Sequence, residues 1–226
     1  MLLNTLMGGD LREFFISLLL SLPIVFLSLS VHETAHGFVA YKLGDPTAHN
    51  YGRLTLNPIK HIDPIGFICM LFFGFGWAKP VPVNSRYFKK PRRDMALTGV
   101  AGPISNLLLA MVFALLARLE FALCDPRALV IPETTVDFIW YFLWEMLWIG
   151  IEINVVFAVF NMIPIPPLDG SRLLFAFLPP QQYFKFMKYE RYISILLMVA
   201  LFLGFLDTPI NLVSNLFFNL ITKLFF

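Results

Sequence analysis

The sequence predicts an all-α protein that crosses a membrane about four to five times, and three observations lead to that fold class. First, 58% of its 226 residues are hydrophobic and only 14% are charged, whereas soluble domains average about 45–50% and 25%. Second, apolar runs of spanning length recur along the chain. Third, basic residues gather in two of the segments between these runs. The net charge of +2 is too small to indicate nucleic-acid binding, so the expected surrounding is a lipid bilayer.

The spanning helices are expected where the apolar runs lie. The first covers residues 14–42, with a kink at Pro23. At 1.5 Å per residue it would extend roughly 43 Å, more than the ~30 Å hydrocarbon core, so one end should protrude. The others are expected at 95–118, 139–163, 190–206 and, as a spanning or an interfacial helix, 210–226. We expect a single membrane-embedded domain over 1–226, with its core at 14–175 and C-terminal helices at 190–226.

The loop at 43–94 is expected to have structure of its own. Arg53–Leu56 alternates polar and apolar residues, as a half-buried strand does. Ile65–Trp77 is an apolar run with three glycines, too short to cross the membrane as a helix. We therefore expect a small re-entrant or β element between the first and second helices. A strand edge in the 52–77 region could hold an extended peptide by β-addition.

The distribution of charge predicts the orientation. Eight of the 17 basic residues lie in 43–94 and four in 171–191, whereas the 119–138 connection holds one basic residue against four acidic ones. The positive-inside rule then places 43–94 and 171–191 in the cytoplasm. Cys69 and Cys124 would lie on opposite sides of the membrane, so no disulfide is expected between them.

The first helix contains the run His32-Glu33-Thr34-Ala35-His36. Residues four apart share a helix face, so both imidazoles can bind one ion, and zinc accepts neutral histidine nitrogens. The glutamate would lie beside the metal, where it can take a proton from water. His32 precedes Lys42 by ten residues, roughly 15 Å along the axis, which is inside the bilayer near its cytoplasmic edge. The alternative is a polar cluster that pairs helices.

A third ligand is expected from the segment that follows the third span. Asn161-Met162-Ile163-Pro164-Ile165-Pro166-Pro167-Leu168-Asp169-Gly170 is rich in prolines, which unwind the backbone. Unwound backbone at membrane depth is tolerated where it lines a cavity. Asp169 could therefore reach the metal as a carboxylate ligand. Alternatively, Asp169 caps the helix that begins at Gly170.

Together these two motifs resemble the signatures of the site-2 protease family, intramembrane zinc metalloproteases that cut substrates within or near their spanning segments. The resemblance implies His32, His36 and Asp169 as zinc ligands, Glu33 as general base, and Asn161 as a contact to the substrate or its oxyanion. Gly102-Pro103-Ile104-Ser105-Asn106 resembles a further family motif, in which small residues permit close helix contact. The chain resembles a minimal, core-only member.

The expected function is thus regulated proteolysis of membrane-spanning proteins in a bacterial or archaeal cell membrane, with the active site toward the cytoplasm. Two alternatives stay open: a prenyl-protein processing protease, and a non-catalytic metal-binding or adaptor protein. Glu145 and Glu152 share one face of the third helix and either line a polar cavity or bond within the bundle. His49 and His61 are expected to be loop residues without a metal role. The substrate, the regulation and the oligomeric state do not follow from the sequence.

Overall fold

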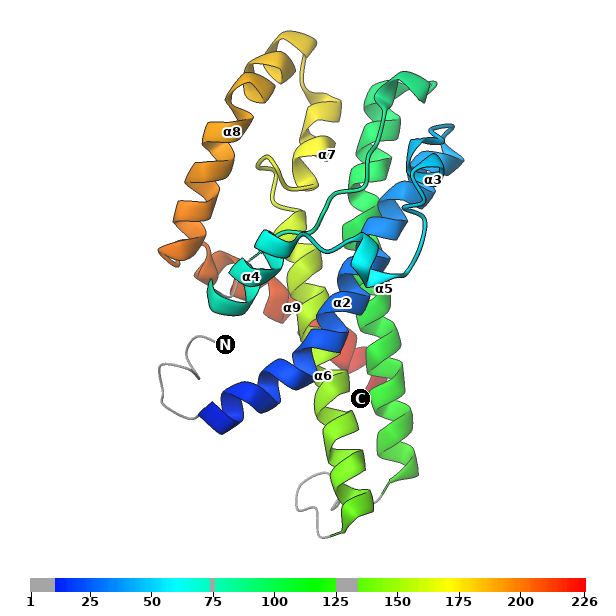
Figure 1. Ribbon diagram of the computed structural model, residues 1–226, viewed down its shortest axis with the longest axis vertical. Helices are drawn as coiled ribbons and strands as arrows, with labels where there is room; N and C mark the ends of the chain where they lie inside the picture. Colours follow the sequence, from blue (N-terminus) through cyan, green and yellow to red (C-terminus); the bar gives the residue numbers. More distant parts are fainter. Residues whose placement is uncertain (1–10, 74–75, 125–133) are drawn as a thin grey trace.

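The computed structural model, described over residues 11–73, 76–124 and 134–226, is a bundle of helices (Figure 1). The helices are α2 (Leu11–Lys42), α3 (Thr47–Asn50), α4 (Pro64–Phe73), α5 (Pro91–Leu123), α6 (Thr135–Asn161), α7 (Gly170–Phe177), α8 (Pro180–Phe202) and α9 (Asp207–Phe225). Two 3-10 turns, η1 (Pro58–Lys60) and η2 (Ser85–Tyr87), lie between α3 and α5. No β-strand occurs in the described ranges. The predicted all-α class is confirmed.

Within these ranges, α2, α5 and α6 are long and apolar enough to cross a membrane. They correspond to the first three predicted spans, but α5 and α6 begin earlier than hydropathy indicated. Pro91 opens α5 at a position where a missing N–H costs nothing. Thr134 and Asp137 form a capping box that starts α6, each side chain accepting from the other's backbone N–H. Hydropathy marks the part of a helix inside the bilayer, not its polar ends.

The C-terminal helices decide whether the described residues hold three or four spans, against the four to five that we expect from the sequence. Residues Lys188–Phe202 of α8 and all of α9 form a pair bent by 80°. The break lies at Gly204, whose φ of +73° favours glycine. Counted as one broken span, the pair brings the total to four; otherwise the described residues hold three. The segment 210–226 is therefore the second arm of this bent pair.

The predicted β element is wrong. Residues 64–73 form α4, because the Asp63 carboxylate accepts from the Gly66 N–H and Pro64 opens the helix. The described part of the loop holds a single bridge, between Ile62 and Ala78. Residues 74–75 of the apolar run and 125–133 of the polar connection lie outside the described residues.

Arg53–Leu56 is not a strand either, because its polar groups bond elsewhere. The Thr55 carbonyl accepts from the Thr34 hydroxyl at 2.7 Å and from His61 Nε2 at 2.7 Å. An apolar-polar alternation over only four residues is too short to distinguish a strand from an irregular segment fixed by side chains.

Helix α5 packs against four other helices, α2, α6, α7 and α9, and so connects the parts of the bundle. Toward α6 it presents three fully buried small residues, Ala110, Ala114 and Ala117, which let the two backbones approach closely. Ile151 and Val155 of α6 fill the space beside them. This position matters for function, because the elements next to α5 carry every predicted metal ligand.

Candidate metal centre

The structure brings the three predicted ligands together. His32 and His36 lie one turn apart on α2, and Asp169 lies at the N-terminus of α7. The Asp169 Oδ2 atom is 3.0 Å from His32 Nε2 and 2.9 Å from His36 Nε2, and the two nitrogens are 3.0 Å apart. All three side chains are buried. The three donor atoms form a nearly equilateral triangle.

This triangle suits zinc. Ligands 2.0–2.1 Å from a tetrahedral ion lie about 3.3 Å apart, so the donors would separate by a few tenths of an ångström to admit it. Two imidazole nitrogens and one carboxylate oxygen are zinc's usual ligands, and three protein ligands leave the fourth position open, as catalytic sites do. Structural zinc sites, by contrast, use four protein ligands.

Hydrogen bonds on the far side of each imidazole fix its orientation. His36 Nδ1–H donates to the Thr98 carbonyl at 2.7 Å, and His32 Nδ1–H donates to Asn106 Oδ1 at 2.5 Å. Because both acceptors require a proton on Nδ1, each Nε2 is left with the lone pair that binds a metal. The Asn106 amide nitrogen donates in turn to Asn154 Oδ1 at 2.8 Å.

Sequence reasoning missed these roles of Asn106 and Asn154. Asn106 stood in a motif interpreted only as close packing, and Asn154 was not singled out. The available signal was a pair of amide side chains inside apolar helices, where an unpaired polar group is costly. Both are fully buried.

Two glycines of α5 permit the close approach that the Gly102–Asn106 motif predicts. A Cβ on Gly102 would lie 2.5 Å from His36 Nε2 and 2.6 Å from His32 Nε2. A Cβ on Gly99 would lie 3.0 Å from the Asp169 carbonyl. The predicted metal ligands therefore pack directly on the α5 backbone, and the predicted function of small residues in this motif is confirmed.

The carboxylate of Asp169 faces the histidines and makes no capping bond to α7. The second oxygen of Asp169, Oδ1, is 3.4 Å from Arg172 Nη1. This geometry favours the ligand role over the capping alternative.

Glu33 lies beside the triangle without joining it. It is only 9% exposed, and its Oε2 accepts from the Val81 N–H at 2.9 Å. Asn161 ends α6, and its amide donates to the Phe157 carbonyl at 2.9 Å; its predicted contact with substrate stays a prediction. The other two histidines lie outside the donor cluster: His61 is buried against Thr55, and His49 is exposed.

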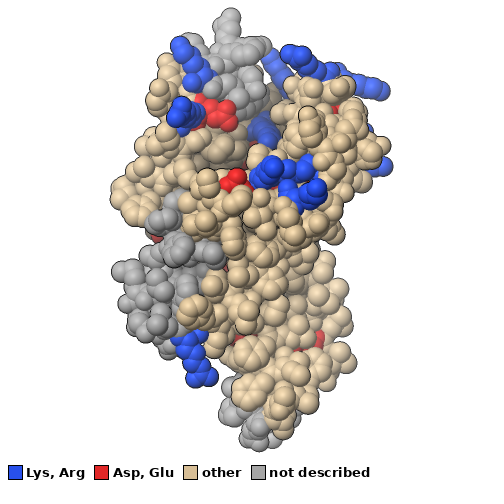
Figure 2. All heavy atoms as spheres, viewed as in Figure 1, with Lys and Arg blue, Asp and Glu red and all other residues tan. Residues whose placement is uncertain are grey.

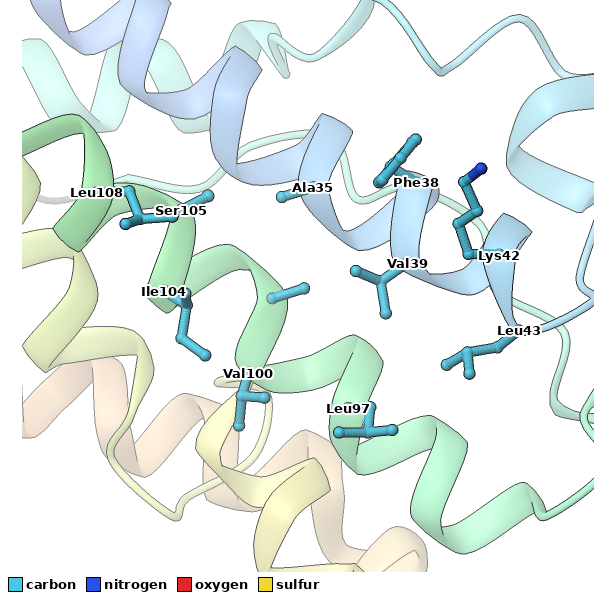
Figure 3. A pocket seen from close by; sticks show the side chains of 11 residues that line it. Ala35, Phe38, Val39, Lys42, Leu43, Leu97, Val100, Ile104, Ser105 and Leu108 are labelled. Atoms are coloured by element: carbon cyan, nitrogen blue, oxygen red, sulfur yellow. The ribbon is translucent and has the colours of Figure 1, made fainter. Parts of the chain in front are cut away.

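A groove of about 440 Å³ between α2 and α5 is not the catalytic cleft (Figure 3). Its lining is almost wholly apolar and includes Ala35 and Val39 of α2. Ala35 lies about 200° around the helix from Glu33, so the groove is on the face turned away from the acid. Of the two acids on α6, Glu145 is half-buried and Glu152 is exposed, so the structure does not enclose them in a polar cavity.

Comparison with known proteins gives matches of two kinds. The family model for Peptidase family M50 matches residues 128–206, which include Asp169. Three curated relatives carry the name "Putative zinc metalloprotease": YwhC of Bacillus subtilis (strain 168), Rip2 of Mycobacterium tuberculosis (strain ATCC 25618 / H37Rv) and MJ0611 of Methanocaldococcus jannaschii. No solved structure matches the chain.

The relatives differ in how much of them the chain covers. YwhC is 45% identical over 175 residues, which are 77% of this chain and 76% of YwhC. MJ0611 is 30% identical over 161 residues, 69% of each protein. Rip2 is 31% identical over 165 residues, 69% of this chain but only 56% of Rip2. Together with a buried donor set that suits zinc and helices of membrane-spanning length, these matches show that the chain is a zinc metalloprotease of the membrane and belongs to Peptidase family M50, the site-2 protease family.

Proposed function

We propose that this protein hydrolyses peptide bonds of membrane-spanning proteins at a site inside the bilayer. The observation that carries the proposal is the position of the donor triangle. His32 and His36 lie within a helix of spanning length, ten and six residues before its end at Lys42. At 1.5 Å per residue these distances are about 15 and 9 Å, within the ~15 Å of one leaflet's hydrocarbon.

The chain's own residues divide the chemistry between them. His32, His36 and Asp169 would hold zinc, which when bound supplies a Lewis acid that activates water and polarises a carbonyl. Glu33 takes the proton of the attacking water and delivers it to the leaving amine. Its Oε2 is engaged by Val81, so Oε1 is the oxygen that receives the proton. Asn161 at the end of α6 is the proposed contact to the substrate or its oxyanion.

The substrate class follows from depth and burial. A site within a spanning helix is reached by segments that themselves lie in or next to the bilayer. A helical segment hides its peptide bonds in internal hydrogen bonds, so the substrate must unwind before cleavage. We infer that the substrate is a membrane-spanning protein, that a lipid bilayer surrounds the enzyme, and that nucleic acid is not a partner.

The active site is proposed to open toward the cytoplasm. The visible lysine and arginine side chains gather mostly at the upper end of the molecule (Figure 2), where Figure 1 places α3, α7 and the start of α5. The C-terminus of α2, which follows the histidines, lies at the same end. The positive-inside rule makes this end cytoplasmic.

Comparing membrane proteomes tests the proposal. Cells that carry the active enzyme should accumulate fragments ending inside a spanning segment, and cells that carry Glu33→Gln should not. The second candidate, a non-catalytic metal-binding protein, predicts zinc in the purified protein and the same fragments in both strains. The presence of Glu33 favours the enzyme, because a purely structural zinc site needs no base.

A further inference from the structure

One backbone group outside α2 holds Glu33. The Val81 N–H donates to Oε2 at 2.9 Å, and both residues are buried. The Val81 side chain packs on α2, where a Cβ on Gly37 would lie 3.2 Å from Val81 Cγ1. Its neighbours Pro80 and Pro82 have no N–H. Within this short segment, only Val81 can donate to the carboxylate.

The peptide unit that carries this N–H is held from its other side by Arg53. Arg53 Nη2 donates to the Lys79 carbonyl at 2.5 Å and to the Pro80 carbonyl at 3.3 Å. The Pro80 carbonyl and the Val81 N–H belong to one planar trans peptide, so they point in opposite directions. A cation therefore holds the oxygen end of this peptide while Glu33 accepts from its nitrogen end. Both interactions polarise the peptide in the same sense.

The burial of Arg53 is otherwise unexplained. The side chain is 7% exposed, its Nε has no partner, and no salt bridge joins it to an acid among the described residues. Burying a guanidinium without an acid is costly. A loop that needed only to be tied down could use neutral donors. A positive charge on Arg53 has a function here if it acts on the Glu33 carboxylate through the Pro80–Val81 peptide that lies between them.

We propose that Arg53 is a positioning residue for the general base, acting on Glu33 through the Pro80–Val81 peptide. It fixes the plane of that peptide, the Val81 N–H fixes Oε2, and Oε1 is left aimed at the water. This inference rests on the proposed function, because it assigns Arg53 a part in the same proton transfer. The side-chain hydrogen bonds of Arg53 go to the Lys79 and Pro80 carbonyls and not to the predicted metal ligands.

A double-mutant cycle tests the proposal, with turnover and zinc content measured for Arg53→Ala, Glu33→Gln and the double variant. A misplaced catalytic group costs up to about 100-fold, so Arg53→Ala should lower kcat about 10- to 100-fold while KM and zinc stay near wild type. In the Glu33→Gln background the same substitution should cost less than about twofold, because the group it positions is gone. The matched control is Arg86→Ala, an exposed arginine of η2, which should leave kcat unchanged.

Two more variants keep the test decisive if Arg53→Ala does not fold. Val81→Pro removes the N–H and keeps Arg53, and it should show the same loss of kcat with zinc retained. Arg53→Lys keeps a cation and should recover part of the activity. Multiplicative losses in the cycle, zinc lost with Arg53→Ala, or full activity in Val81→Pro would each overturn the proposal. Undiminished proteolysis by Glu33→Gln alone would instead refute the base role of Glu33, and failure of the wild-type protein to cleave any membrane-spanning protein would refute the proposed function.

Discussion

Replacing Gly102 by alanine should remove zinc from a protein that still folds. The new Cβ would lie 2.5 Å from His36 Nε2 and 2.6 Å from His32 Nε2, whereas ordinary contacts begin at 3.4 Å. An imidazole must therefore retreat by about 0.9 Å, and metal-ligand distances tolerate only about 0.2 Å. Overpacking costs about 1–3 kcal/mol, but alanine regains about 1 kcal/mol of helix propensity. The net loss of stability is thus about 0–2 kcal/mol, too small to unfold the bundle.

The assay compares zinc per chain, proteolysis and thermal unfolding of Gly102→Ala with those of Gly150→Ala. In the control, the added methyl meets the Phe113 ring at 2.8 Å in the helix core, not the imidazoles. Both variants should unfold at similar temperatures, but only Gly102→Ala should lose most of its zinc and activity. Full zinc occupancy in Gly102→Ala would show that the histidines do not pack on α5 as described.

Three further predictions follow from the site and the charge distribution. Asp169→Ala should purify with little zinc and no proteolysis, measured by metal analysis; full occupancy would return Asp169 to a capping role. Asn106→Leu removes the acceptor that orients His32, so zinc affinity or activity should fall about 10- to 100-fold; unchanged affinity in a competition titration with a chelator would contradict this role. In protein whose native cysteines are changed to serine, a cysteine at Lys90 should react with impermeant reagent only from the cytoplasm, and one at Thr135 only from outside. The reverse labelling would invert the proposed orientation.

The sequence predicted the metal site better than the loop before α5. His32 and His36 share a helix face by spacing alone, and the resemblance between motifs implied Asp169 across more than 130 residues of chain. The prolines before Asp169 indicated unwound backbone, which the structure has at that place. Local periodicity is informative where a helix is long and its pattern repeats.

The prediction of a strand in the loop before α5 failed for a physical reason. The alternation at Arg53–Leu56 resembled a strand, but two side chains bond the Thr55 carbonyl, and the described residues hold no strand that could offer an edge to the substrate. Contacts across the fold, such as Val81 with Glu33, depend on how the loop lies against α2. No local sequence pattern predicts such a contact, because neither residue differs from its sequence neighbours in a way that points to the other.

We propose Glu33 as the general base of a zinc-dependent hydrolysis and not as a metal ligand. The most direct measurement is zinc content together with turnover of purified Glu33→Gln on a membrane-spanning substrate. Gln keeps the size of the side chain and removes its basicity, and His32, His36 and Asp169 remain to bind the metal. General base catalysis contributes about 10²–10⁴-fold. We expect near-stoichiometric zinc with turnover reduced by at least about 100-fold. Loss of zinc together with activity, or undiminished activity, would contradict this role of Glu33.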